Sequence, residues 1–367
     1  MDLAPKEVVN LITGDINALE HFRIRAQARR LFTPAISQSA HESVLIVEVT
    51  RDCNLRCLHC CFDYGGRQKL ALEFFSCLTA QVNLSELVLS GGEPLLHHQI
   101  FSLIELSLSR APKVSLVTNG TVQYPPALRK LADGGATLVI SLDGARAETH
   151  DRLRGAGVFN LAIGTALQFR ALSPNLELSF TCNRRNLHEI PQMFDLAYSL
   201  GASKINFRPV YAPVGSKWES LSLDQADFNR AWLELVDLTV AHRRKIQVKN
   251  IALMFDNVRF GQRQICGAGK HLFFLQADRR LSPCRYWSKT HSIKLDLATM
   301  VKVINGADAF PSRPAPATTD ICQACIWRAI CAGGCLAQSC AMDDARGYCY
   351  HEIYKYILNK ILINEVV

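Results

Sequence analysis

Apolar runs that indicate buried strands alternate with helical patterns from about residue 43 onward. The predicted strands are Val44–Val49, Leu87–Ser90, Val114–Thr118, Leu138–Leu142, Leu176–Thr181 and Lys204–Phe207. Helical periodicity lies between them, for example at Leu70–Ala80, Gln99–Arg110 and Val158–Leu172. Continuously apolar strands are typical of a sheet covered on both faces, and their alternation with helices indicates parallel pairing. Because six such units do not complete an eightfold barrel, the sequence predicts an α/β fold with an open, partial (β/α)6 TIM-like barrel.

The pattern changes on both sides of this region. Residues 1–42 show helical periodicity from about Glu7 to Phe32, which predicts an N-terminal helical extension that caps the barrel. The barrel is expected to span residues 43–250 and to end with a helix at about Leu221–His242. Residues 251–367 hold eight of the 14 cysteines and predict a second, small, cysteine-organised domain, closed by a helix at Tyr350–Val367.

Composition narrows the classes of protein that fit. The N-terminus carries no secretory signal and no apolar run is long enough for a membrane span, so we expect a cytoplasmic protein without a membrane partner. In that setting 14 cysteines are better explained by metal or cluster ligation than by disulfides. The net charge of +8 (41 basic and 33 acidic residues) suits an anionic cofactor or an acidic peptide. No block of like charges is present, and no nucleic acid is expected as a partner.

Three cysteines share one short loop directly after the first predicted strand. Cys53, Cys57 and Cys60 follow the spacing C-x3-C-x2-C. A cubane 4Fe–4S cluster has four irons, and each iron needs a ligand. Three protein thiolates therefore leave one iron open for another molecule. This open position favours an enzyme over a simple electron carrier.

A second motif, Gly91-Gly92-Glu93-Pro94, follows the second predicted strand. Its two glycines allow the backbone to approach a ligand closely, and its proline stiffens the exit. Together the cysteine loop and this turn resemble the radical S-adenosylmethionine (SAM) superfamily over about residues 43–210. The resemblance implies that the amino and carboxylate groups of SAM chelate the open iron, and that the turn holds the amino group. It also implies cleavage of SAM to a 5′-deoxyadenosyl radical that abstracts hydrogen from a substrate.

The same resemblance assigns further residues around SAM. His59 occupies the aromatic position before the third cysteine, near the adenine. Ser141 and Arg154 would bind the SAM carboxylate, since an arginine fork suits a carboxylate. Asp143 either belongs to this site or forms a turn. Asn119 either lines the SAM pocket or belongs to a plain turn.

The C-terminal cysteines form a dense series, Cys322-x2-Cys325-x5-Cys331-x3-Cys335. Zinc is one alternative, because four thiolates suit its tetrahedral geometry. The full series resembles the SPASM domain of radical SAM enzymes, which implies two auxiliary 4Fe–4S clusters. By that resemblance the outer cluster would be bound by Cys322, Cys325, Cys331 and Cys349, and the inner one by Cys266, Cys284 and Cys335. The inner cluster would then have an open iron or a non-cysteine ligand, and Cys340 remains an alternative to Cys349.

Two positions depart from the SPASM pattern. Arg279 stands five residues before Cys284, where the family usually has glycine. Arg285 stands where sulfatase-maturing relatives carry an aspartate base, which disfavours that reaction.

The predicted substrate is a ribosomally made peptide that is oxidatively modified or crosslinked. The alternative is a small biosynthetic intermediate, tetrapyrrole or aminoglycoside-like. Expected partners are an electron donor such as flavodoxin or ferredoxin and a separate leader-peptide-binding protein. A non-catalytic iron–sulfur or zinc scaffold that binds nucleic acid is a remote alternative.

Overall fold

The computed structural model describes residues 42–60, 62, 66–212, 216–260, 267–311, 322, 325, 327, 331, 335, 337 and 348–362. The expected helix at Glu7–Phe32 lies outside the described residues, as do Cys61, Cys266 and Cys340.

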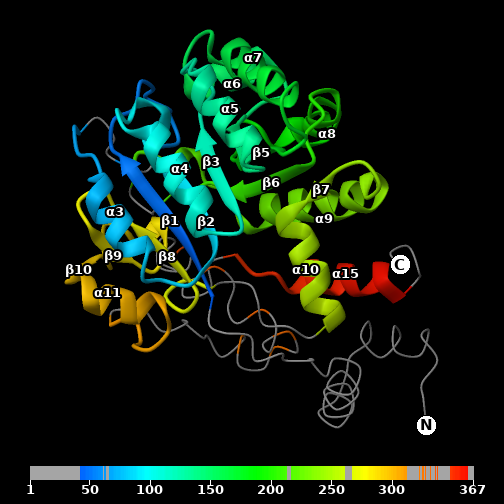
Figure 1. Cartoon of the computed structure of the whole chain (residues 1–367). Coiled ribbons are helices and arrows are strands. Elements are labelled where there is room, and N and C mark those ends of the chain that lie inside the picture. Colours follow the sequence, from blue (N-terminus) through cyan, green and yellow to red (C-terminus); the bar gives the residue numbers. More distant parts are fainter. Residues whose placement is uncertain are drawn as a thin grey trace.

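One sheet runs through the molecule, in the strand order β10-β9-β8-β1-β2-β3-β4-β5-β6-β7 (Figure 1). The strands that carry the predicted barrel pair in parallel from β1 to β7. Their bounds are β1 Ser43–Thr50, β2 Leu84–Gly91, β3 Val114–Thr118, β4 Thr137–Ser141, β5 Leu176–Cys182, β6 Lys204–Pro209 and β7 Gln247–Val248. The predicted partial α/β barrel is therefore confirmed, and β7 adds a short strand beyond the six expected.

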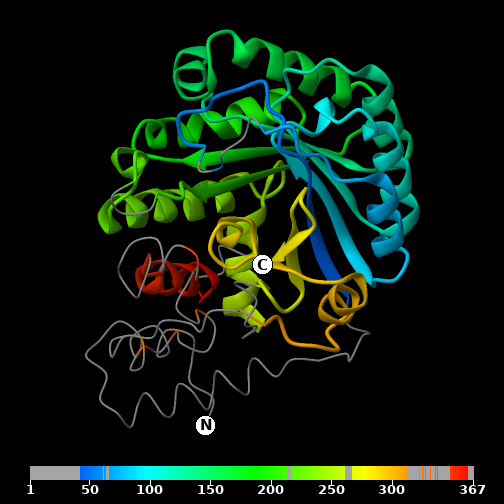
Figure 2. The same cartoon turned by 90° about the vertical axis from the view of Figure 1, so that its left-hand side faces the viewer.

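Helices connect the strands and cover the convex side of the curved sheet (Figure 2). They are α3 Leu72–Thr79, α4 Ile100–Arg110, α5 Pro125–Asp133, α6 Ala147–Arg154, α7 Val158–Arg170, α8 Ile190–Ser199 and α9 Gln225–His242. Alternate residues of β1, such as Leu45, Val47 and Val49, are fully buried. Helix-covered parallel strands explain why the apolar runs were so continuous in the sequence.

The C-terminal part of the chain joins the same sheet. β8 (Leu272–Leu275) pairs in parallel with β1, and β9 (Arg280–Ser282) and β10 (Ile293–Lys294) continue as antiparallel strands. The remaining α-helices of the described residues are α10 Lys249–Phe260, α11 Leu297–Ile304 and α15 His351–Leu362, of which α15 corresponds to the predicted closing helix. The domain boundary between residues 250 and 251 stays a prediction, although β8 lies beyond it and adjoins β1. Within the described ranges, no helix is both long and apolar enough to cross a membrane.

Candidate active site

The turn after β2 lies directly against the cysteine loop after β1. The backbone N–H of Gly92 donates to the carbonyl of Thr50 at 2.8 Å, and that of Glu93 donates to the carbonyl of Asp52 at 2.7 Å. A Cβ at Gly92 would lie 2.2 Å from the Asp52 carbonyl oxygen. Gly91 has a φ of +146° and would place a Cβ 2.4 Å from the carbonyl oxygen of Thr50. Both glycines are therefore required by this close approach.

The Glu93 side chain links the turn to the end of β3. Its fully buried carboxylate accepts hydrogen bonds from Thr118 Oγ1 at 2.7 Å and from the Asn119 N–H at 2.8 Å. The same carboxylate accepts a hydrogen bond from the backbone N–H of Leu95. Glu93 thereby caps the N-terminus of the short helix Pro94–Leu96. Burial raises the pKa of Glu93 to about 7, although these hydrogen bonds favour the ionised form.

Asn119 extends this connection back to the cysteine loop. Its Nδ2 donates to Asn54 Oδ1 at 3.0 Å, and Asn54 in turn donates to Thr121 Oγ1 at 2.7 Å. Asn119 is thus held between the turn and the loop, and it does more than form a simple turn. Whether it also contacts SAM stays a prediction.

Asp143 and Arg154 form a buried ion pair beside the cysteine loop. Arg154 Nε lies 2.5 Å from Asp143 Oδ2, and His59 Nε2 lies 3.3 Å from the same oxygen. Burial alone would raise the pKa of Asp143, but the Arg154 charge, His59 and the N–H of Thr181 lower it below its usual range. Burial lowers the pKa of His59 to about 4, so its imidazole is neutral at pH 7. The structure thus brings His59, Asp143 and Arg154 together, and their contacts with SAM stay a prediction.

Helix α6 positions Arg154, and two further contacts hold this helix. The N–H of Leu58 in the cysteine loop donates to the carbonyl of Leu153 at 2.7 Å. At the start of α6, the buried Glu189 carboxylate accepts from Thr149 Oγ1 at 2.6 Å and from Arg146 Nε at 2.9 Å. Glu189 was not singled out in the sequence, where its spacing carries no signal. Ser141 is the last, half-buried residue of β4.

The three thiols of the cysteine loop lie near one another in the structure. Cys53, Cys57 and Cys60 are partly exposed and lie within electrostatic reach of one another. In the described part of the chain, no three Cys, His, Asp or Glu side chains converge as closely as a single ion requires. Burial raises the pKa of Cys53, and that of Cys57 to about 11, so metal binding must displace their protons. Three partly exposed thiols on one loop are a donor set that a 4Fe–4S cluster can use, with one thiolate on each of three irons.

The described C-terminal cysteines lie in several different surroundings. Cys284 and Cys335 pack against the small apolar cluster of Trp287 and Ala337. Cys325 interacts electrostatically with Cys322 and Cys349, and its Sγ lies 3.7 Å from His351 Nδ1. Cys331 lies within electrostatic reach of Tyr350 and Tyr354, and Cys335 lies within reach of Tyr350 as well. The inner and outer ligand sets implied above stay a prediction.

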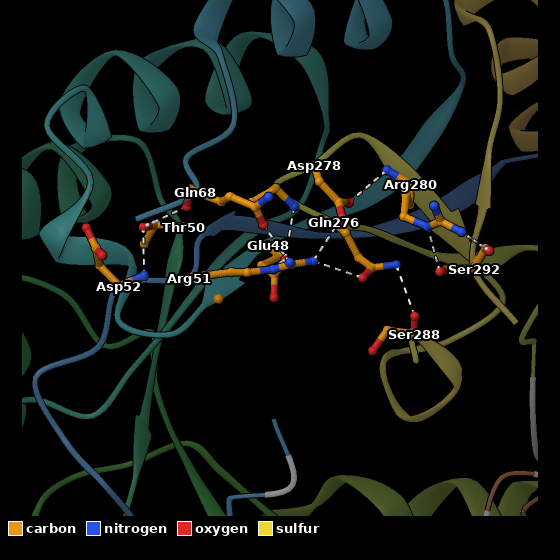
Figure 3. A network of polar contacts seen from close by, with 12 residues as sticks. Glu48, Thr50, Arg51, Asp52, Gln68, Gln276, Asp278, Arg280, Ser288 and Ser292 are labelled. Carbon is orange, nitrogen blue, oxygen red and sulfur yellow. Dashed lines mark hydrogen bonds and ion pairs between the residues drawn. The ribbon is translucent and has the colours of Figure 1, made fainter. Parts of the chain in front are cut away.

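A polar network that the sequence analysis missed joins β1 to the β8–β9 turn (Figure 3). Arg51 Nε lies 3.0 Å from Glu48 Oε2, and Arg51 Nη2 lies 3.3 Å from Asp278 Oδ2. The backbone N–H of Ala277 donates to the same Glu48 oxygen at 3.0 Å. Arg51 directly precedes Asp52 and the cysteine loop, so this network fixes the loop to the C-terminal hairpin.

The comparisons with known proteins agree with this geometry. Residues 47–197 match the sequence profile of the radical SAM superfamily. An AdoMet-dependent heme synthase of Methanosarcina barkeri is 34% identical over 192 residues, which cover 50% of this chain and 54% of that protein. Mycofactocin maturase MftC of Mycobacterium tuberculosis is 25% identical over 308 residues, 79% of this chain and 77% of that protein. Residues 47–197 therefore carry a radical SAM domain, and the chain spans little more than half the length of the heme synthase it matches.

Solved structures share the fold over most of the chain. Native anSMEcpe with bound AdoMet and Cp18Cys peptide matches with a TM-score of 0.72 and 19% identity, covering 88% of this chain and 98% of that one. Streptococcus suis SuiB bound to precursor peptide SuiA matches with a TM-score of 0.68 and 15% identity, covering 92% and 82%. At these identities the likeness establishes the architecture.

Proposed function

We propose that this chain is a radical SAM oxidoreductase that abstracts hydrogen from its substrate. When bound, the 4Fe–4S cluster and SAM supply a 5′-deoxyadenosyl radical. The role of the protein in this reaction is to bind and orient the cluster and SAM and to exclude water. Cys53, Cys57 and Cys60 would hold the cluster. SAM would be bound by the turn from Gly91 to Pro94 and by His59, Asn119, Ser141, Asp143 and Arg154.

The observation that carries this proposal is the pair of backbone hydrogen bonds from Gly92 and Glu93 to the loop with the cysteines. These bonds bring a glycine turn and an incomplete set of thiols to the carboxyl ends of adjacent parallel strands. That edge is where ligands bind in open α/β sheets. A scaffold that only stored a cluster would need neither the second turn nor the buried Asp143–Arg154 pair.

The favoured substrate is a ribosomally made peptide that is modified oxidatively. MftC is named a maturase and aligns over most of this chain, and SuiB is described with its precursor peptide. On this proposal a separate protein would present the leader peptide. An electron donor such as flavodoxin or ferredoxin would reduce the cluster, and two auxiliary clusters would lie at the C-terminal cysteines.

A small-molecule substrate is the second candidate, and a specific observation favours it. Three curated relatives that align over half of the chain or more are named AdoMet-dependent heme synthase, Fe-coproporphyrin III synthase and pre-heme d1 synthase. Their identities, 34%, 29% and 30%, exceed the 25% of the maturase of M. tuberculosis. A tetrapyrrole-like intermediate is therefore the alternative to a peptide.

The test is anaerobic reconstitution with iron and sulfide, followed by dithionite and SAM. We expect 5′-deoxyadenosine to accumulate in the wild-type protein and to be absent from Cys57→Ala. Cys77→Ala is the matched control, because Cys77 is exposed on α3 and away from the loop. Reconstituted wild-type protein that yields no 5′-deoxyadenosine, and whose reduced EPR signal is unchanged by SAM, would overturn the proposal.

A further inference from the structure

A row of polar side chains crosses β4, β5 and β6 on one face of the sheet. In the parallel register Ser141 lies opposite Ser179, and Ser179 lies opposite Asn206. Two residues nearer the carboxyl ends of the strands, Thr181 lies opposite Arg208. Because side chains two residues apart on a strand project from the same face, this row leads from Ser141, a residue of the candidate site, to Arg208.

The residues between them identify which face this is. Phe180 and Phe207 alternate with the polar residues and are fully buried, and the Phe207 ring stacks on that of Phe194 in α8 with centroids 5.7 Å apart. The helices, α8 among them, cover the convex side of the sheet (Figure 2). Strand alternation therefore places Thr181 and Arg208 on the concave side.

The row also adjoins the candidate active site. The backbone N–H of Thr181 donates to Asp143 Oδ1 at 2.7 Å, and the other oxygen of Asp143 pairs with Arg154. Arg208 is therefore one strand away, about 4.8 Å between backbones, from a residue that contacts the buried ion pair. It lies near the carboxyl end of β6, at the edge where open α/β sheets bind their ligands.

Asn206 holds one edge of the Arg208 guanidinium. With the amide of Asn206 oriented so that its nitrogen donates to Asn250 Oδ1 at 3.3 Å, its oxygen accepts from Nε and from Nη2 of Arg208, both at 2.8 Å. Arg208 is exposed, and among the described residues no carboxylate pairs with it. An amide is neutral and leaves the charge of Arg208 unbalanced. The terminal edge of the guanidinium presents two further parallel N–H donors, an arrangement that matches a carboxylate.

We propose that Arg208 is an anion subsite that binds a carboxylate of the substrate, and that Asn206 is the residue that positions it. This inference rests on the proposed function in placing the substrate on the concave face beside the SAM site. Either an acidic residue of a peptide or the propionate group of a small molecule supplies such a carboxylate, and the test separates the two sources.

The test measures binding of small probes to the reconstituted full-length protein by ligand-observed NMR titration, first alone and then with saturating SAM but no reductant. One probe pair is the α-amide of N-acetylglutamate and that of N-acetylglutamine, and the other is 3-phenylpropionate and its amide. In the pair that resembles the substrate, we expect the acid to bind about tenfold more tightly than its neutral counterpart. The pair with the tighter acid identifies the source, and displacement of that acid by SAM would overturn the proposal.

The preference for the acid should disappear in Arg208→Gln, weaken in Arg208→Lys and persist in Arg243→Gln. Arg243 is a matched control because it is exposed at the end of α9. Asn206→Asp keeps the arginine but places a carboxylate against it, so this variant should lose the preference as well.

A second measurement needs no variant. The better acid, but not its neutral counterpart, should protect Arg208 from phenylglyoxal in the wild-type protein, as read by peptide mass spectrometry. Equal binding of acid and neutral probe in both pairs, an undiminished preference in Arg208→Gln or Asn206→Asp, or modification that the acid does not slow would each overturn the proposal. None of these results depends on 5′-deoxyadenosine formation, so the proposed function is judged separately.

Discussion

The backbone N–H of Glu93 donates a 2.7 Å hydrogen bond to the carbonyl oxygen of Asp52. This bond connects the residue before the first cysteine of the loop to the turn of the neighbouring strand. The adjacent N–H of Gly92 makes the parallel contact to Thr50. The two segments are therefore held at backbone distance, which leaves no space for a side chain at Gly92.

Gly92→Ala is expected to push the turn away from the cysteine loop. Its Cβ would lie 2.2 Å from the Asp52 carbonyl oxygen, and overpacking of this kind typically costs about 1–3 kcal/mol. Iron and sulfide analysis after reconstitution should show a reduced cluster content. Gly164→Ala is the control, because Gly164 lies within α7 and its Cβ would meet nothing within 4 Å. That change should stabilise the protein by about 1 kcal/mol.

Arg154→Leu should strongly destabilise the protein, because it leaves the Asp143 carboxylate buried without its cation. Breaking one side of a buried ion pair typically costs about 3–5 kcal/mol. Adding Asp143→Asn to this variant should recover part of the loss, since the unpaired charge is then removed. Urea unfolding of the two single variants and the double variant measures the coupling. Strictly additive losses would mean that the pair does not interact as the 2.5 Å distance indicates.

Arg279 has a φ of +67°, a region in which a side chain is strained and glycine is not. Its guanidinium lies 4.9 Å from the Phe74 ring centroid, which offsets some of this strain. Arg279→Ala removes the ring contact and keeps the strain, whereas Arg279→Gly removes both. The glycine variant should therefore be more stable than the alanine variant by about 1 kcal/mol in urea unfolding. An alanine variant as stable as the glycine one would contradict the strained backbone.

Glu93 should make stability fall as the pH rises through the neutral range. Its pKa is about 7 in the folded state against 4.5 without burial, so between these values only the folded chain keeps the proton. The contribution is fully present below about pH 4.5 and is lost above pH 7, at a cost of about 3 kcal/mol. The difference in the free energy of unfolding between wild type and Glu93→Gln, measured between pH 5 and 8 without SAM, should show this slope, since buried histidines such as His59 contribute equally to both proteins. Parallel pH profiles would show that Glu93 stays ionised.

Replacing Cys53, Cys57 and Cys60 together by alanine should leave the auxiliary clusters in place. Two remaining cubanes hold about eight irons per chain, against about twelve for three clusters. Iron and sulfide analysis with anaerobic Mössbauer spectra provides the measurement. An iron content well below eight would contradict two auxiliary clusters, and zinc in its place would support the tetrahedral thiolate alternative.

The strands of the barrel could be predicted from the sequence, because strands that are buried on both faces consist of long apolar runs. The predicted start of β2 was three residues late, because the polar Ser85 and Glu86 interrupt its apolar pattern after Leu84. β8 was missed because it has only four residues and lies in a cysteine-rich region of the sequence. No local pattern states that such a strand pairs with β1.

Some residues of the candidate site could likewise be predicted from local sequence motifs, and others could not. The cysteine loop, the glycine turn and Arg154 are local motifs, and the structure brings them together. Arg285 was seen only as a departure from a pattern, because its contact with Gly91 joins residues 194 positions apart. Arg51 and Asp278 are ordinary charged residues in the sequence, and only the folded hairpin makes them partners.

β8 pairs with β1 from Val44 to Val47, so one of the two neighbours of β1 in the sheet comes from the C-terminal part of the chain. Cutting the chain after residue 250 would bare one side of β1, and unprotected sheet edges recruit other strands. A shortened barrel is thus expected to aggregate instead of serving as a minimal catalyst. A chimera in which the C-terminal part of the chain is exchanged must therefore supply a strand that pairs with the free edge of β1.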